Sequence, residues 1–244
     1  MKIEGRNAVM EALKSEQTVD RLVAQKDLKD SAAQRIIDEA KKRGVKIKFY
    51  DKEALDRESR TGRHQGFIAE ITDFKYCELD DILSYAEKRE EKPFIILLDG
   101  VEDPHNLGSV LRVAECAGAH GVVIPTHRSV SVNETVIKVS AGAAGHVRVH
   151  KAANISDTIE TLKKRNIWVY CADLNGQSLY KTDLTGAVAI VVGGEGKGVG
   201  TRVKACCDGA VTIPMLGKVN SLNASVAAGV VAFEKVRQDN VRKP

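Results

Sequence analysis

The feature that most constrains the fold is the regular alternation of short apolar runs and amphipathic segments over residues 93–244. Some of these runs, such as Val188–Val192, continue without the polar alternation of a half-exposed strand. Continuous apolar runs are typical of parallel strands that helices cover on both faces. The pattern therefore predicts an α/β fold whose ligands bind beyond the carboxyl ends of the strands.

The same alternation predicts individual elements. In the C-terminal block, strands are expected at 94–98, 121–124, 167–172, 187–192 and 210–213, and helices at 107–117, 133–143, 155–165 and about 221–237. In the N-terminal block, helices are expected at 7–14 and 31–43, and strands at 19–25, 45–50 and 66–71. Ser31 is the expected cap of the second helix, and Gly44 its expected stop.

Charge and composition divide the chain into three parts. Residues 73–92 hold seven acidic and four basic residues and end at Pro93, where a strand-like run begins. We expect an N-terminal α/β domain at 1–72, an acidic linker at 73–92 and a second domain at 93–244. The net charge of +4 permits an anionic partner without requiring one.

The cysteines and apolar runs indicate where the chain works. It has five cysteines, two of them adjacent, and no Cys-x-x-Cys or clustered histidines, so neither a disulfide framework nor a metal site is expected. No apolar run reaches the roughly 20 residues of a membrane helix, and no signal-peptide core follows Met1. These features predict a cytoplasmic protein with no membrane partner.

Three segments that could carry chemistry each follow an expected strand. The first, Leu98–Arg112, contains Asn106 as a candidate helix N-cap and Arg112 on the following helix. Taken alone, Arg112 is better explained as a solvated residue of an amphipathic helix than as a ligand-facing one. The third, Ile213–Gly229, leads through Ser221 and Asn223 into a helix of small residues, where free backbone N–H groups favour electron-rich ligands.

The second segment, Val191–Gly200, has five glycines between Gly193 and Gly200. Glycine lets a backbone approach a ligand closely. A phosphate-binding P-loop would need Ser or Thr after Lys, but Lys197 is followed by Gly198 and Val199, and no Gly-x-Gly-x-x-Gly register fits. The segment therefore predicts a binding loop that is neither of these nucleotide motifs.

Together the three segments resemble the signature motifs of the SpoU family, also called the TrmH family, of RNA ribose 2′-O-methyltransferases in the SPOUT superfamily. The matching patterns are Asn106-x-Gly-x-x-x-Arg112, Gly193-Gly-Glu195-Gly-x-Gly198, and Ile213-Pro-Met-x-Gly217-x-x-x-Ser221-Leu-Asn223-x-Ser225. The resemblance covers 93–244. Two further stretches, Glu4–Val9 and Arg63–Gly66, look like the L30e-like substrate-binding domain of RlmB-type members, which are 23S rRNA guanosine 2′-O-methyltransferases.

The resemblance implies a SPOUT-type parallel sheet with a C-terminal deep trefoil knot, preceded by the small L30e-like α/β domain. It also implies a homodimer that binds S-adenosyl-L-methionine and methylates a ribose 2′-OH in RNA, with 23S rRNA as the expected partner and no metal. The implied catalytic residues are Asn106, Arg112, Glu195, Ser221 and Asn223. The implied cofactor-binding residues are Gly193, Gly194, Ile213, Met215, Gly217 and Leu222. The implied RNA-binding residues are Arg6, Asn7, Arg63 and His64.

Other functions stay open at this point. A tRNA 2′-O-methyltransferase shares the core motifs, although the chain ends at Val241–Pro244 with almost no basic extension. A catalytically silent RNA-binding or ribosome-assembly factor is a further alternative, and it would have no need of all five catalytic positions. The family is often assigned an arginine as general base, yet a guanidinium is normally always protonated.

Overall fold

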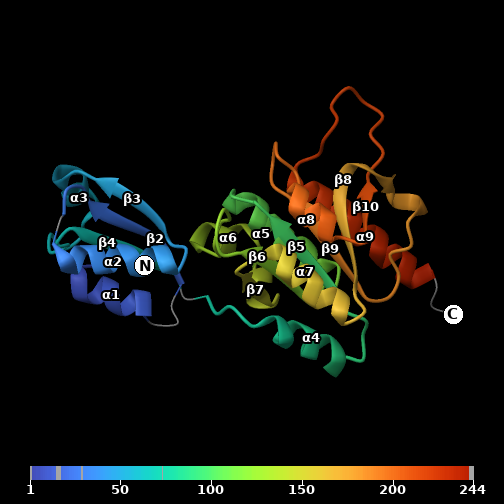
Figure 1. Cartoon of the computed structure of the whole chain (residues 1–244), viewed down its shortest axis with the longest axis horizontal. Coiled ribbons are helices and arrows are strands. Elements are labelled where there is room, and N and C mark those ends of the chain that lie inside the picture. The colour runs from blue at the N-terminus through green and yellow to red at the C-terminus, as the bar shows by residue number, and fades with distance from the viewer. Residues whose placement is uncertain (1, 15–17, 29, 73, 242–244) are drawn as a thin grey trace. The chain divides into compact units, whose positions relative to one another are not determined.

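The computed structural model describes residues 2–14, 18–28, 30–72 and 74–241. It divides into two compact units, an N-terminal one that ends at Lys75 and also includes residues 131–134, and a C-terminal one that holds the rest of the chain from Tyr76. The predicted domain ends at Met1, Asp73 and Pro244 lie outside the described residues. Each unit is an α/β layer structure, as Figure 1 shows. No helix among the described residues is long and apolar enough to span a membrane.

The N-terminal unit is a four-stranded sheet of order β1-β4-β2-β3. Its elements are β1 (Lys2–Glu4), α1 (Arg6–Lys14), β2 (Thr18–Gln25), α2 (Ser31–Lys42), β3 (Lys46–Tyr50), α3 (Lys52–Glu58) and β4 (Phe67–Thr72). Strand β4 runs antiparallel to β1 and β2, whereas β2 and β3 are parallel.

The two faces of this sheet have separate apolar cores. Helices α1 and α2 pack Val9, Leu13 and Ile36 against one face, and α3 packs Leu55 against Val23 and Ile68 on the other. The expected strands and the first two helices are present, but β1 and α3 were not predicted. Ser31 is the first residue of α2 rather than its cap: the Asp30 carboxylate accepts from the Ala33 backbone N–H at 2.9 Å.

The C-terminal unit is a six-stranded sheet of order β10-β8-β9-β5-β6-β7, in which every described pair is parallel. Its strands are β5 (Phe94–Asp99), β6 (Gly121–Pro125), β7 (Val149–Ala152), β8 (Trp168–Ser178), β9 (Val188–Gly193) and β10 (Gly209–Thr212). Its helices are α4 (Leu79–Lys88), α5 (Pro104–Cys116), α6 (Glu134–Val139), α7 (Ile155–Lys164), α8 (Thr201–Cys206) and α9 (Ala224–Val241).

The predicted parallel α/β sheet is confirmed, with helices on both faces. Apolar side chains of α4, α7 and α8 pack on one face, while α5 and α9 contact each other and the strands on the opposite face. Strand β7 and helix α8 were not predicted. The trefoil knot stays a prediction.

The acidic segment 73–92, which was expected to be a linker, contains a helix. Helix α4 lies within it, with Glu78 and Asp81 forming a capping box at its start. Ile82 and Leu83 of this helix are buried in the core of the C-terminal unit. A fragment that begins at Phe94 would therefore lose part of that core.

Candidate functional site

The three signature segments meet at the carboxyl ends of β5, β9 and β10, as Figure 1 allows the reader to follow. Beside them lies a cavity of about 690 Å³. Its lining comes from the middle of β8, the glycine-rich loop after β9, Lys204 of α8, the end of β10 with the loop that follows it, and the start of α9. This is the edge of a parallel sheet where ligands are expected.

The glycine-rich loop is fixed by Asp99 at the end of β5. The backbone carbonyl of Asp99 accepts from the Gly194 N–H at 2.8 Å, and the Oδ2 atom of Asp99 accepts from the Gly200 N–H at 2.8 Å. A Cβ on Gly194 would lie 2.1 Å from the Gly100 carbonyl oxygen, and one on Gly193 would lie 2.0 Å from the Gly198 carbonyl carbon. Glycine at 194 therefore lets the loop pack against the backbone that follows β5, and glycine at 193 lets the loop fold back on itself.

A triangle of polar side chains connects the three segments. Asn223 Nδ2 donates to Asn106 Oδ1 at 2.8 Å and to Glu195 Oε1 at 2.7 Å. Asn106 Nδ2 also donates to Glu195 Oε1, at 3.1 Å. Asn106 is buried, so these bonds satisfy a side chain that would otherwise be costly to remove from water. Each residue of this amide–carboxylate triangle (Asn106, Glu195 and Asn223) comes from a different motif.

One of the two helices at this site has a different cap from the one predicted. Asn106 is not the N-cap of α5; Asp103 is, and its Oδ1 accepts from the His105 backbone N–H at 2.9 Å. At α9, the residue that accepts from the first turn is Asn223, whose Oδ1 receives the Ser225 backbone N–H at 3.0 Å and the Ser225 hydroxyl at 2.7 Å. Ser225 thus fixes the Asn223 amide so that Nδ2 faces the triangle.

The implied site residues divide into three groups. Gly193, Gly194, Glu195, Ile213, Met215, Ser221, Leu222 and Asn223 line the cavity. Asn106 is joined to them by hydrogen bonds. Gly217 and Arg112 are exposed and do not line the cavity, and the Arg112 side chain makes no hydrogen bond or ion pair with the part of the chain that the structure describes.

Sequence reasoning missed Asp99 and an ion pair between Asp173 and Lys204, and it gave no role to Ser225 of the third motif. Both Asp173 and Lys204 line the cavity. The hydrogen bond from Lys204 and the backbone N–H of Asn175 lower the pKa of the Asp173 carboxyl, which keeps it ionised. Asp173 directly follows the predicted strand 167–172, so the rule for ligands at strand ends could have identified it.

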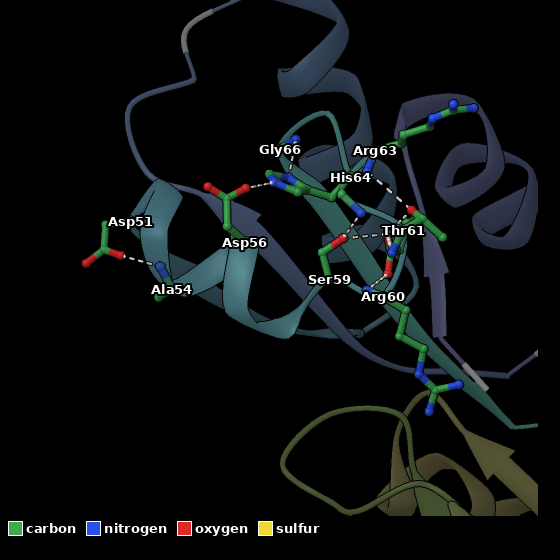
Figure 2. Close-up of polar contacts among 11 residues, drawn as sticks. Asp51, Ala54, Asp56, Ser59, Arg60, Thr61, Arg63, His64 and Gly66 are labelled. Atoms are coloured by element: carbon green, nitrogen blue, oxygen red, sulfur yellow. Dashed lines mark hydrogen bonds and ion pairs between the residues drawn. The ribbon is translucent and has the colours of Figure 1, made fainter.

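The N-terminal unit has its own polar cluster, in the loop from Ser59 to Gly66 (Figure 2). His64 is buried: its Nδ1 accepts from the Gly66 backbone N–H at 3.0 Å, so Nε2 carries the proton and donates to Asp56 at 2.7 Å. The Arg6 guanidinium binds Asp30 with two hydrogen bonds, of 2.8 and 2.9 Å.

The four implied RNA-binding residues therefore have different surroundings. The side chains of His64 and Arg6 are hydrogen-bonded to carboxylates of the same unit. Asn7 and Arg63 are exposed. Within the described ranges, no three His, Cys, Asp or Glu side chains lie together in a way that could hold a metal ion.

Comparison with known protein families gives two matches that together span nearly the whole chain. Residues 93–233 match the SpoU rRNA Methylase family. Residues 2–77 match the domain described as RNA 2′-O ribose methyltransferase substrate binding. The first match covers more than half of the chain and contains all three segments that meet at the cavity.

Curated relatives agree over their full length. YacO of Bacillus subtilis (strain 168), which its name assigns to the TrmH family of tRNA/rRNA methyltransferases, is 44% identical over 97% of this chain and 95% of its own. A relative with the same family name in Staphylococcus aureus (strain MSSA476) is 38% identical over 97% of this chain and 95% of its own.

Solved structures share the fold. The SpoU methyltransferase AviRb of Streptomyces viridochromogenes, in complex with the cofactor AdoMet, aligns with a TM-score of 0.62 and 22% identity over 98% of this chain and 90% of its own. A Porphyromonas gingivalis protein assigned to the TrmH family aligns with a TM-score of 0.59 and 27% identity over 98% of this chain and 90% of its own.

Proposed function

This chain belongs to the SpoU family of RNA methyltransferases, and we propose that it transfers a methyl group from S-adenosyl-L-methionine to a ribose 2′-OH of RNA, most specifically to a guanosine of 23S rRNA. The observation that supports catalysis most directly is the amide–carboxylate triangle at the mouth of the cavity. A catalytically silent RNA-binding protein would have no need of a hydrogen-bond network that joins three distant motifs.

The cavity suits the donor in size and chemistry. Its volume of about 690 Å³ lies within the range of about 300–1,000 Å³ that is typical of small-molecule sites. Backbone groups of the glycine-rich loop lie beside the apolar side chains of Ile213, Met215 and Leu222. When bound, S-adenosylmethionine supplies a methyl group on a positively charged sulfonium. The ionised Asp173 carboxylate and the Lys204 ammonium that it pairs with add one charge of each sign to the lining.

The acceptor side of the reaction needs alignment and removal of a hydroxyl proton. Alignment of two reactants can contribute about 7–11 kcal/mol of the barrier, and a general base about 10²–10⁴-fold in rate. Glu195 is held by two amide donors, and Asn223 is held by Ser225, so both present fixed polar atoms beside the cavity. We assign them and Asn106 to orienting the substrate and the donor, together with Ser221.

Arg112 has a different role in this proposal. A guanidinium is a poor general base, so we assign Arg112 to binding the phosphate next to the reacting ribose and to stabilising the developing alkoxide. Arg112 is exposed in the single chain and does not line the cavity. This supports a homodimer in which the active site lies at the subunit interface. Two apolar side chains of α9, Val226 and Phe233, are 49% and 48% exposed, which also favours a partner subunit.

A second substrate class remains, because the relatives are named for both tRNA and rRNA. The discriminating experiment incubates the full chain and labelled S-adenosylmethionine with unmodified 23S rRNA or tRNA transcripts. We expect label in 23S rRNA. Label in tRNA alone would retain the reaction and change the substrate. The cytoplasmic location belongs to the proposal and is not tested by this assay. An absence of label in both transcripts and in ribosomal assembly intermediates would contradict the proposed activity.

Removal of the N-terminal unit separates donor binding from RNA recognition. A fragment that begins at Tyr76 keeps α4 and the whole C-terminal core. We expect it to bind S-adenosylmethionine within about twofold of the full chain and to lose RNA methylation. Calorimetric titration and label incorporation measure the two effects. The matched control is a fragment that begins at Phe94 and lacks α4. It should unfold at a lower temperature, because the loss of Ile82 and Leu83 exposes the core side chains that they cover. Full RNA methylation by the Tyr76 fragment would exclude a substrate-binding role for the N-terminal unit.

A further inference from the structure

The carboxylate of Glu4, at the end of β1, is bonded entirely by one loop. Its Oε1 accepts from the Arg60 backbone N–H at 2.6 Å. Its Oε2 accepts from the Ser59 hydroxyl at 2.7 Å, from the Thr61 backbone N–H at 3.3 Å and from the Thr61 hydroxyl. Partial burial raises the pKa of Glu4, but these hydrogen bonds outweigh it and lower the pKa to about 2. The carboxylate is therefore ionised at neutral pH and fixes three consecutive residues.

Further hydrogen bonds close the rest of the loop, which we define as residues 59–66. The Gly62 N–H donates to the Ser59 hydroxyl at 2.9 Å, and the Arg63 N–H donates to the Thr61 hydroxyl at 3.2 Å. At its far end, His64 joins the loop to Asp56 of α3 at 2.7 Å (Figure 2). The backbone of the loop is thus ordered before any ligand arrives, which lowers the entropy cost of binding.

Two guanidinium groups of this ordered loop have no bonding partner among the described residues. Arg60 and Arg63 are exposed, and their side chains bond to no acceptor there. Figure 2 shows the two side chains leaving the loop in different directions. Two other arginines of the unit are paired with carboxylates: Arg6 binds Asp30, and Arg21 binds Glu70 at 2.5 Å. The loop therefore presents two uncompensated charges on a fixed backbone.

We propose that Glu4 is a positioning residue that orders loop 59–66 and thereby holds Arg60 and Arg63 against two separate phosphates of the RNA. The inference rests on the proposed function, because it takes RNA as the ligand of this unit. Arginine presents planar donors that match phosphate oxygens, and contacts to phosphate fix the register of a protein on nucleic acid without reading its sequence. Because the two side chains diverge, they contact different phosphates.

The salt dependence of RNA binding tests this assignment. Each phosphate contact contributes roughly 0.7 to 0.9 to the slope of log K against log salt concentration. For an unmodified 23S rRNA transcript and the full chain, this slope is negative. Arg60→Gln and Arg63→Gln should each reduce the magnitude of the slope by about one. Glu4→Gln should reduce the magnitude of the slope by about two. We expect the same reduction for the double variant Arg60→Gln/Arg63→Gln.

The Glu4 variant separates positioning from simple electrostatics. Glu4→Gln removes a negative charge, so electrostatics alone predicts tighter RNA binding, whereas loss of the ordered loop predicts weaker binding. A glutamine supplies one acceptor oxygen, so it cannot replace the bonds at both Oε1 and Oε2. Glu11→Gln is the matched control, because Glu11 is exposed on α1 and makes no bond within the described part of the chain. It should bind RNA at least as tightly as the parent.

The triple variant Glu4→Gln/Arg60→Gln/Arg63→Gln distinguishes positioning from general destabilisation. If Glu4 acts through the two arginines, adding Glu4→Gln to the double variant changes RNA affinity by less than about twofold, which is the coupling expected of residues that act as one unit. A further loss of tenfold or more, or unchanged slopes in both single arginine variants, would overturn the proposal. Arg35→Gln, an exposed arginine on α2, controls for charge and should leave the slope unchanged.

Two further measurements distinguish a failure of this assignment from a failure of the proposed methyltransferase activity. Far-UV circular dichroism and thermal unfolding show whether each variant is folded, and calorimetry shows whether it binds S-adenosylmethionine. Phosphate contacts do not depend on sequence, so the slopes can be measured even if no methyl group is transferred. Methylation with unchanged slopes would overturn the assignment of Glu4, Arg60 and Arg63 and leave the methyltransferase intact.

Discussion

Replacement of Gly194 by alanine should abolish measurable donor binding at concentrations that saturate the parent protein. The new Cβ would lie 2.1 Å from the Gly100 carbonyl oxygen. This oxygen belongs to the backbone, so it cannot move away by a change of side-chain rotamer. The glycine-rich loop must then move away from Asp99, and the cavity wall moves with it. Overpacking of this kind costs about 3 kcal/mol at the upper end of its usual range, or about 100-fold in affinity. Isothermal titration with S-adenosylmethionine measures the loss.

The matched control for this change is Gly145→Ala. No atom lies within 4 Å of a Cβ built on Gly145, and its φ is not positive. It should bind the donor as the parent does and unfold at the same temperature. If Gly194→Ala bound S-adenosylmethionine with near-parental affinity, the glycine-rich loop would not form the wall of the donor site.

Arg112→Lys should reduce kcat for methyl transfer by about 10²–10³-fold, the loss typical of removing one group that stabilises the charge of the transition state. Lysine keeps the positive charge but lacks the planar fork that binds phosphate with two parallel hydrogen bonds. Donor affinity should not change, because Arg112 does not line the cavity. Single-turnover rates with saturating RNA, together with donor titration, separate the two quantities.

The control for Arg112→Lys is Arg35→Lys, an equivalent change at an exposed arginine of the N-terminal unit that has no bond within the described chain. It should leave kcat within about twofold of the parent. A near-normal rate for Arg112→Lys would show that charge alone suffices at this position. A rate for Arg112→Ala close to that of the parent would remove Arg112 from the mechanism altogether.

The sheet of the C-terminal unit was predictable because its central strands are continuous apolar runs. Strands β5 and β9 are buried along almost their whole length, and each was located within one or two residues at its ends. Helix α4 was missed for the opposite reason. Its many acidic residues suggested a solvated connector, although Ile82, Leu83 and Ala86 share one apolar face. A net charge over a window hides such a face, whereas helical spacing reveals it.

The candidate site was predictable in part. The resemblance to the family motifs identified Asn106, Glu195 and Asn223, and the positions of the three segments after strands indicated that they would meet at one edge of the sheet. Their hydrogen bonds join residues 89 and 117 positions apart, which no local pattern determines. The same limit explains the missed Asp99, since its role depends on the backbone N–H groups of Gly194 and Gly200 about one hundred residues later.

The measurement that tests the central claim most directly is an alkaline-hydrolysis ladder of 23S rRNA after incubation with the full chain and S-adenosylmethionine. A methylated 2′-OH cannot attack the neighbouring phosphate, so the modified nucleotide leaves one gap in the ladder. The account predicts a single gap at a guanosine, absent when Arg112→Ala replaces the parent. Methyl label in RNA with an unbroken ladder would place the methyl group on a base and contradict 2′-O transfer.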